Sequence, residues 1–188
     1  MRIISGFFKG KKIFEPKDIK TRPLKDLTKE SIFNILNHSK KFNVELKNSV
    51  ILDLFSGVGS FGIECLSREV KKVIFVENYN GVLPVLKKNL LNIKPYLNYE
   101  IFEKNIYDKN TFLKFIDKFD IIFLDPPYKD KNLEIILNYI KETKILKKKG
   151  IIVVHRHKKE EDSLPEGFKI IEEKKYGISK ILFLNYSS

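Results

Sequence analysis

The sequence predicts an α/β fold built on a mainly parallel, seven-stranded sheet that ends in an antiparallel C-terminal hairpin. Three observations lead to this prediction. Short apolar runs alternate with stretches whose apolar residues recur about every 3.6 positions. A glycine-rich turn directly follows the first apolar run of the sheet. The last two runs meet at Tyr176-Gly177, a connection too short for a helical crossover and typical of a hairpin.

The N-terminal part of the chain is predicted to be a small hairpin followed by a helix. Residues 3–14 form two short strands around Phe8-Lys9-Gly10, a turn-compatible sequence. A helix is predicted over residues 24–37, because the apolar positions there follow a helical period. We therefore expect a basic N-terminal extension over residues 1–48 and a sheet domain over residues 49–188.

The sheet domain contains the alternating elements. Its strands are predicted at residues 50–55, 73–76, 99–103, 121–124, 151–154, 168–172 and 178–184. Helices are predicted between them at residues 59–67, 79–91, 111–115 and 133–140. The run Lys147-Lys148-Lys149 is expected to be a solvated loop between a helix and a strand.

The net charge of the chain indicates which class of molecule it binds. The chain carries 36 basic and 24 acidic side chains, and its net charge of +12 favours nucleic acid as partner over solubility alone. Within residues 1–31, nine basic side chains are interleaved with phenylalanines. Basic groups can bind phosphates while flat rings bind bases, although the same rings could fill the core of a hairpin.

Cysteine content and hydropathy argue against a disulfide-bonded protein and against a membrane protein. The only cysteine, Cys65, cannot form an internal disulfide, and we expect it to be a small core residue in a reducing cytoplasm. No apolar run reaches the roughly 18 residues of a membrane span, so no membrane association is expected.

The glycine-rich turn is the first motif that carries chemistry. Residues 53–62 contain the spacing G-x-G-x-x-G between a strand and a helix. Gly57 permits a tight turn, Gly59 lets a ligand approach the backbone, and Gly62 allows close packing of the helix. Glu77 follows the next strand, where a carboxylate can accept hydrogen bonds from ribose hydroxyls.

Two ligand classes suit this turn, dinucleotides and S-adenosylmethionine. Asp53, at the end of the first strand, helps to separate them. Its carboxylate would repel a pyrophosphate and attract the ammonium group of a methionine moiety. In the alternative interpretation, Asp53 only caps backbone amides of the turn.

The second motif is Asp125-Pro126-Pro127-Tyr128, at the end of a fully apolar strand. The prolines stiffen the segment and remove two amide donors, and Asp125 offers only acceptors. Such a cluster suits the –NH2 group of a nucleobase, and Tyr128 can lie against the heteroaromatic ring. The alternative is a strand terminator in which Asp125 caps a helix.

The two motifs together indicate methyl transfer to an amine. The exocyclic amine is a weak nucleophile, and two acceptors that hold its hydrogens can aim its lone pair at the methyl of a sulfonium. No strong base is needed, because the amine becomes acidic once methylated. His155-Arg156-His157 is therefore interpreted as a loop at the rim of the sheet, and no metal is expected.

The sequence resembles the RsmD family, the bacterial 16S ribosomal RNA (guanine(966)-N(2))-methyltransferases. Residues 53–62 resemble the S-adenosylmethionine loop of Rossmann-like methyltransferases, and residues 125–128 the N/D-P-P-Y/F motif of amino-methyltransferases. Further matches are Met1-Arg2-Ile3-Ile4-Ser5-Gly6, Gly10, Arg22-Pro23, residues 30–36, Glu64, Leu66-Ser67-Arg68 and Tyr176-Gly177.

The resemblance implies a cofactor site and a target site. The cofactor would be S-adenosylmethionine, with its methionine end held by Asp53, Ser56, Gly57 and Gly59. Its ribose would be held by Glu77 and its adenine by Asn105 and Ile106. The target guanine would be held by Asp125, Pro126 and Tyr128.

The resemblance also implies ribosomal RNA as partner, within the small subunit or an assembly intermediate, bound by a monomeric enzyme. RNA phosphates would be bound by Arg2, Lys9, Lys11 and Arg22. Two positions depart from the family pattern. Lys29 stands where arginine is expected, which loses bidentate phosphate recognition, and Glu69-Val70 replaces Gly-Ala.

Other functions remain open from the residues alone. A DNA or other RNA amino-methyltransferase, acting on adenine N6 or cytosine N4, could use the same motif. An NAD-dependent oxidoreductase would use the glycine turn but leave the proline segment unexplained. A non-catalytic RNA-binding protein would need neither motif.

Overall fold

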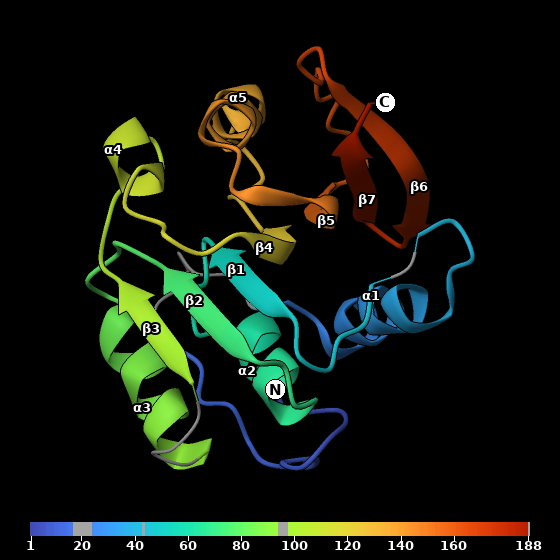
Figure 1. The fold of residues 1–188 in the computed structure, drawn as a ribbon. Coiled ribbons are helices and arrows are strands. Elements are labelled where there is room, and N and C mark those ends of the chain that lie inside the picture. The colour runs from blue at the N-terminus through green and yellow to red at the C-terminus, as the bar shows by residue number, and fades with distance from the viewer. Residues whose placement is uncertain (17–23, 43, 94–97, 188) are drawn as a thin grey trace.

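The computed structural model describes residues 1–16, 24–42, 44–93 and 98–187. It contains a seven-stranded sheet whose strands lie in the order β3-β2-β1-β4-β5-β7-β6 (Figure 1). The strands are β1 (Val50–Leu54), β2 (Lys72–Val76), β3 (Tyr99–Phe102), β4 (Phe119–Leu124), β5 (Leu146–His157), β6 (Phe168–Tyr176) and β7 (Ser179–Tyr186). Only the pairs β5–β7 and β6–β7 are antiparallel, so the predicted Rossmann-like fold is confirmed.

Helices cover both faces of this sheet. They are α1 (Asp26–His38), α2 (Ser60–Ser67), α3 (Leu83–Ile93), α4 (Lys109–Phe112) and α5 (Leu133–Thr143). Helices α1, α2 and α3 pack on one face, and α4 and α5 on the other (Figure 1). Alternate strand residues separate the two cores: Ile51 faces the first group of helices, and Leu52 faces the second. Both faces are buried, which explains the continuous apolar runs in the central strands.

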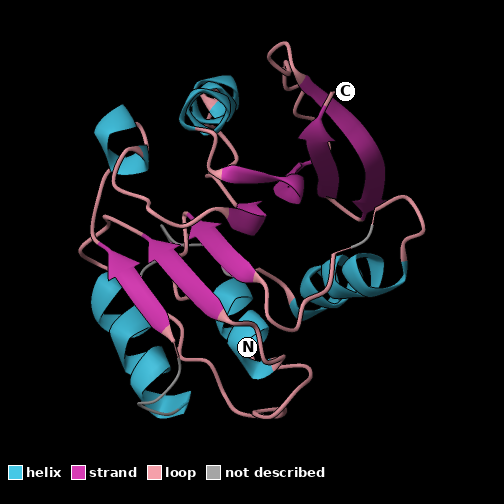
Figure 2. Ribbon diagram, viewed as in Figure 1, coloured by secondary structure: helices cyan, strands magenta, loops and turns pink. Residues whose placement is uncertain are grey.

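The N-terminal segment folds back on itself as the predicted hairpin does, but its arms form no regular strands (Figure 2). An antiparallel bridge between Arg2 and Lys12 joins the two arms, with further backbone hydrogen bonds beside it. Other backbone amides bind α2: those of Ile4 and Ser5 donate to Glu64, at 2.8 and 2.9 Å. Phe8 is buried in the core under α2, while the neighbouring Phe7 is 75% exposed.

The β5 strand is longer than predicted at both ends. The lysine run 147–149, expected to be a loop, lies inside β5 at an irregularity in its pairing with β4. The register shifts between Phe119 and Ile121, so the extra residues bulge outward and stay exposed. At its other end β5 continues to His157, because β7 supplies an antiparallel partner there.

A smaller difference concerns the start of α3. The helix predicted from residue 79 begins at Leu83, after a turn in which the amides of Val82 and Leu83 donate to the Tyr79 carbonyl. Cys65 is fully buried in α2, as predicted. Among the described residues, no helix has the length and apolar character needed to cross a bilayer.

Candidate active site

The two motifs meet at one edge of the sheet. Strands β1 and β4 are parallel neighbours, and Leu54 of β1 pairs with Leu124 of β4. The glycine turn and the Asp-Pro-Pro-Tyr segment therefore leave adjacent strands side by side. A cavity of about 510 Å³ opens between them, within the size range of small-molecule sites. Its lining includes Ser56, Gly57, Asp125, Pro126 and Tyr128, as the prediction of one shared site requires.

The glycine turn needs its glycines for space and for backbone conformation. Gly57 and Gly59 have φ angles of 55° and 84°, in the left-handed region. A Cβ atom on Gly59 would lie 2.6 Å from Leu86 Cδ1, and one on Gly62 would lie 2.3 Å from the Phe75 ring. Gly62 thus permits the close helix packing that its position in the motif predicts.

Asp53 lies where it could contact a cofactor, and it also caps a backbone amide of the glycine turn. It lines the cavity, and its Oδ2 also accepts a 3.0 Å hydrogen bond from the Gly62 amide. Burial raises the pKa of Asp53 well above its ordinary value, and the nearby carboxylates of Asp125 and Glu77 raise it further, against the lowering by Gly62. A ligand cation placed here would therefore stabilise the ionised form of Asp53.

Glu77 braces the glycine turn. Its Oε2 accepts a 2.9 Å hydrogen bond from the Gly57 amide, and its Oε1 accepts from the amides of Asn78 and Tyr79. The same side chain lines the cavity, at the end of β2. The ribose contact of Glu77 stays a prediction, and the turn-bracing contacts are a second role that the sequence did not reveal.

The predicted adenine contacts fall beside the cavity. Asn105 Oδ1 accepts from the Tyr107 amide, and Ile106 is 5% exposed within the core under α4 and α5. Neither residue lines the cavity, whereas Tyr107 does, together with Phe55. Burial and a hydrogen bond to Asp130 raise the pKa of the Tyr107 hydroxyl. Adenine contact by Asn105 and Ile106 stays a prediction.

A side chain of β5 holds the Asp-Pro-Pro-Tyr segment in place. Arg156 is fully buried and donates to the carbonyls of Pro127 and Asp130, at 3.5 and 2.6 Å. Its Nε donates to Asp162 at 2.9 Å. The Pro127 carbonyl, which the sequence left free to bind a ligand, is therefore used by the chain itself.

His155 and His157 were expected in a rim loop, and this expectation is wrong. Both belong to β5, which β7 extends past the end of β4. His155 Nδ1 lies 2.8 Å from Asp125 Oδ1, and the His157 ring packs edge-on against Tyr128 at 5.3 Å. Sequence reasoning missed these contacts because they depend on a strand that begins more than twenty residues later, at Ser179.

The predicted RNA contacts that the structure describes, Arg2, Lys9 and Lys11, lie in the N-terminal loop. The Arg2 side chain is 73% exposed, and Lys11 Nζ donates to the Asn92 carbonyl. Lys9 lies in the same loop, whose Phe7 amide donates to the carbonyl of Ser67, the last residue of α2. Arg22 falls outside the described residues.

Lys29 does not have the surface position that phosphate binding needs. It is fully buried, and its Nζ donates to the Arg2 carbonyl at 2.8 Å and lies 3.6 Å from Glu64 Oε2. Burial lowers the pKa of Lys29, against the opposing effect of Glu64. This position therefore holds the N-terminal segment onto α1 and α2.

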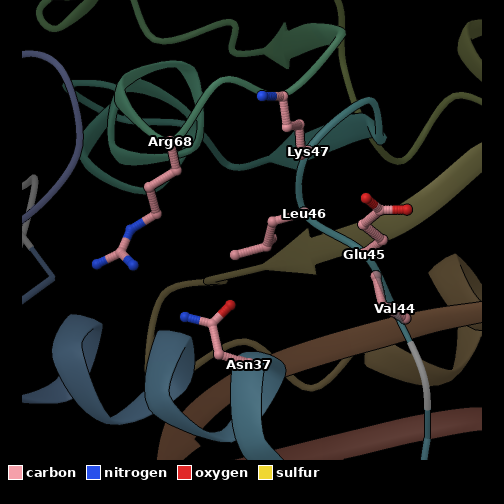
Figure 3. Close-up of a pocket in the computed structure, with 6 residues that line it drawn as sticks. All are labelled: Asn37, Val44, Glu45, Leu46, Lys47 and Arg68. Atoms are coloured by element: carbon pink, nitrogen blue, oxygen red, sulfur yellow. The ribbon is translucent and has the colours of Figure 1, made fainter.

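A second, wider cavity of about 690 Å³ lies away from these motifs (Figure 3). Asn37 of α1, residues 44–47 and Arg68 at the end of α2 line it. The Arg68 guanidinium is already bound by Glu64 and packs over the Phe33 ring. None of the site residues predicted from sequence lines this cavity.

The fold and the first cavity define the class of protein: it is an S-adenosylmethionine-dependent methyltransferase. A family model described as "Conserved hypothetical protein 95" matches residues 1–185. The chain belongs to this family, the RsmD family.

Relatives and solved structures agree with this assignment. The chain is 35% identical to ribosomal RNA small subunit methyltransferase D of Haemophilus influenzae over 182 residues, which cover 95% of this chain and 90% of that protein. A solved structure described as a methylase of the same species has a TM-score of 0.76 at 32% identity and covers 100% of this chain and 98% of that one. A solved structure described as a methyltransferase of Escherichia coli has a TM-score of 0.82 at 26% identity, with coverages of 99% and 97%.

The cavity fits S-adenosylmethionine by its chemistry. Four carboxyl groups, those of Asp53, Glu77, Asp125 and Asp130, line it, which suits a ligand that carries an ammonium and a sulfonium. The backbone at Gly57 is open to close approach, and Phe55 and Tyr107 add an aromatic wall.

Proposed function

We propose that the protein methylates the exocyclic N2 amine of a guanine in 16S, small-subunit ribosomal RNA. The observation that carries this proposal is the shared cavity, in which the glycine turn and the Asp-Pro-Pro-Tyr segment face each other. The relative from Haemophilus influenzae, which is named a ribosomal RNA small subunit methyltransferase, supports the substrate class. The choice of guanine N2 rests on the resemblance to the RsmD family.

The bound cofactor supplies a methyl group on a sulfonium, which is a good leaving group because it departs as a neutral thioether. The side chains and backbone of the protein would hold the target base in position for the transfer. Asp125 and the Pro126 carbonyl would accept the two hydrogens of the amine, and Tyr128 would hold the ring plane. A base inside a duplex cannot reach this cavity, so the target nucleotide must be unstacked or flipped outward.

We further propose that the cofactor contacts follow the family pattern. Asp53, Ser56, Gly57 and Gly59 would hold its methionine end, Glu77 its ribose, and Asn105 with Ile106 its adenine. RNA phosphates would be bound by Arg2, Lys9, Lys11 and Arg22. The enzyme would act in the cytoplasm as a monomer, on the small subunit or an assembly intermediate, with residues 1–48 as the RNA-binding extension.

Mass spectrometry of ribosomal RNA nucleosides tests the proposal. Deletion of the gene should lower N2-methylguanosine in small-subunit RNA, and wild-type protein should restore it. Protein carrying Asp125→Ala should not restore it. A deletion that lowers N6-methyladenosine or N4-methylcytosine instead would move the target to another amine, and an unchanged nucleoside profile would reject the proposal.

A further inference from the structure

The carboxylate of Asp125 has a buried partner that the proposed reaction does not use. We propose that His155 is a positioning residue that fixes the Asp125 carboxylate for methyl transfer, with Ser179 as its anchor. This inference rests on the proposed function, since it assigns Asp125 the role of accepting a hydrogen from the target amine.

The geometry places the imidazole between two hydrogen-bonding groups. Nδ1 lies 2.8 Å from Asp125 Oδ1, and Nε2 lies 2.9 Å from the Ser179 hydroxyl oxygen. His155 is 6% exposed and Ser179 is 5% exposed, and both line the cavity. Because both ring nitrogens are engaged, the ring cannot turn without breaking both hydrogen bonds.

Three strands set this arrangement. The register of β4 and β5 pairs Leu124 with Val154, so Asp125, directly after β4, comes beside His155 of β5. The register of β5 and β7 pairs His157 with Ser179, which places Ser179 diagonally across from His155 on the same face. Side chains held on strands are more precise in position than side chains held on loops.

The hydrogen-bond roles follow from the chemistry of each group. An ionised carboxylate can only accept, so Nδ1 must carry the hydrogen that it shares with Asp125. In the neutral ring, Nε2 must then accept, and the Ser179 hydroxyl can donate to it. Asp125 thus selects the ring tautomer, the Ser179 hydroxyl holds the other ring nitrogen, and Oδ2 of Asp125 is left for the target amine.

The order Ser179–His155–Asp125 also occurs in enzymes that use serine as a nucleophile. Of these three hydrogen-bonded groups, the carboxylate would contact the substrate here, because Asp125 adjoins Pro126 and Tyr128 in the segment that would hold the base. Loss of the Ser179 hydroxyl should therefore weaken methyl transfer without abolishing it, whereas a nucleophile could not be replaced.

Two conservative variants of His155 show whether it positions Asp125 or only fills space. In His155→Asn, the amide nitrogen can occupy the place of Nδ1 and still donate to Asp125. In His155→Gln, the amide reaches the place of Nε2 and no longer reaches Asp125. Single-turnover methyl transfer to small-subunit RNA, cofactor affinity and melting temperature should be measured for both variants and for Ser179→Ala.

We expect the Gln variant to lower the rate of methyl transfer about 10- to 100-fold, with cofactor and RNA affinity unchanged, since misplacement of a reacting group acts on rate. The Asn variant should stay within about threefold of wild type, and Ser179→Ala should lie between them. Equal rates for the Asn and Gln variants would overturn the inference. A wild-type protein that methylates no RNA would instead reject the proposed function.

A second measurement does not depend on activity. The ¹⁵N NMR shifts of the His155 ring should show a hydrogen on Nδ1 in the wild-type protein, and Asp125→Asn should change the Nδ1 signal. A wild-type ring without a hydrogen on Nδ1 would overturn the inference whatever the enzyme methylates.

Discussion

Arg156 of β5 donates a 2.6 Å hydrogen bond to the backbone carbonyl of Asp130, in the turn that follows the Asp-Pro-Pro-Tyr segment. The same guanidinium lies 2.8 Å from an oxygen of Asp162 and is fully buried. The position of the segment therefore depends on β5 as well as on β4, from which it emerges.

Replacement of Arg156 by alanine should strongly destabilise the protein. It leaves the buried Asp162 without its nearest cation and removes the guanidinium that binds the Asp130 carbonyl, so we expect a loss of about 3–5 kcal/mol in the free energy of unfolding. Urea denaturation measures this loss. Lys131→Ala breaks an ion pair in which the lysine side chain is 73% exposed, and it should cost below about 1 kcal/mol. Equal costs for the two variants would contradict the assignment.

Gly59→Ala tests the close packing of the glycine turn, with Gly10→Ala as its control. The two φ angles are +84° and +85°, but a Cβ atom on Gly10 meets nothing within 4 Å. Gly10→Ala should cost about 1–2 kcal/mol for the backbone conformation alone. Gly59→Ala should cost more and should weaken cofactor binding, as calorimetry would show. If Gly59→Ala lowers the free energy of unfolding no more than Gly10→Ala does, the close packing against Leu86 does not restrict this position.

Asp53→Asn should flatten the pH dependence of stability. The pKa of Asp53 is raised well above 3.8, so the folded chain holds a proton that the unfolded chain has released. The stability that Asp53 contributes is thus present below pH 3.8 and lost as the pH rises through the folded pKa. Relative to wild type, the Asn variant should gain stability across this window and be the more stable protein at neutral pH. Parallel denaturant curves for the two proteins at every pH would refute this.

The same residue should link cofactor binding to proton release. A ligand cation lowers the pKa of Asp53, so wild-type affinity for S-adenosylmethionine should rise with pH through the titration of this carboxyl. Calorimetry in buffers of different ionisation enthalpy measures the released proton. Asp53→Asn should bind more weakly and release fewer protons, and equal release by the two proteins would count against an Asp53–cofactor contact.

Charge reversal tests the proposed RNA contacts of the N-terminal loop. Lys9→Glu with Lys11→Glu should weaken RNA binding and reduce the slope of log affinity against log salt, by about 0.7–0.9 for each phosphate that the loop no longer neutralises. Cofactor affinity should stay unchanged. Lys114→Glu with Lys118→Glu, on two exposed lysines beyond α4, supplies a control with the same change of charge. The same salt slope in the double variant and in the control would remove the loop from the RNA interface.

Much of the fold could be predicted because its signals are local. The central strands are mostly apolar, and the longer helices show their own period. Gly57 and Asp125 could be assigned to one site because parallel neighbours end at the same edge of a sheet. The N-terminal hairpin lacks the regular strands predicted for its arms, since two of its backbone amides bind Glu64, a side chain about sixty residues away.

The missed site residues share one cause. His155 and Arg156 are polar residues in a strand that extends only because β7 pairs with it. The sequence favours a surface position for Lys29 because lysine is seldom buried without a partner, and its partner, Glu64, is distant in sequence. Tyr107 was missed because its orientation depends on Asp130. Contacts between distant segments leave no periodic mark in a sequence.

Helix α2 has a mechanical consequence for the molecule. Its first residue, Ser60, adjoins the glycine turn, and its last, Ser67, is bound to the basic N-terminal loop. All eight of its residues are buried, so the helix moves as one stiff rod about 12 Å long. One buried helix therefore connects the turn beside the cofactor cavity to the N-terminal loop.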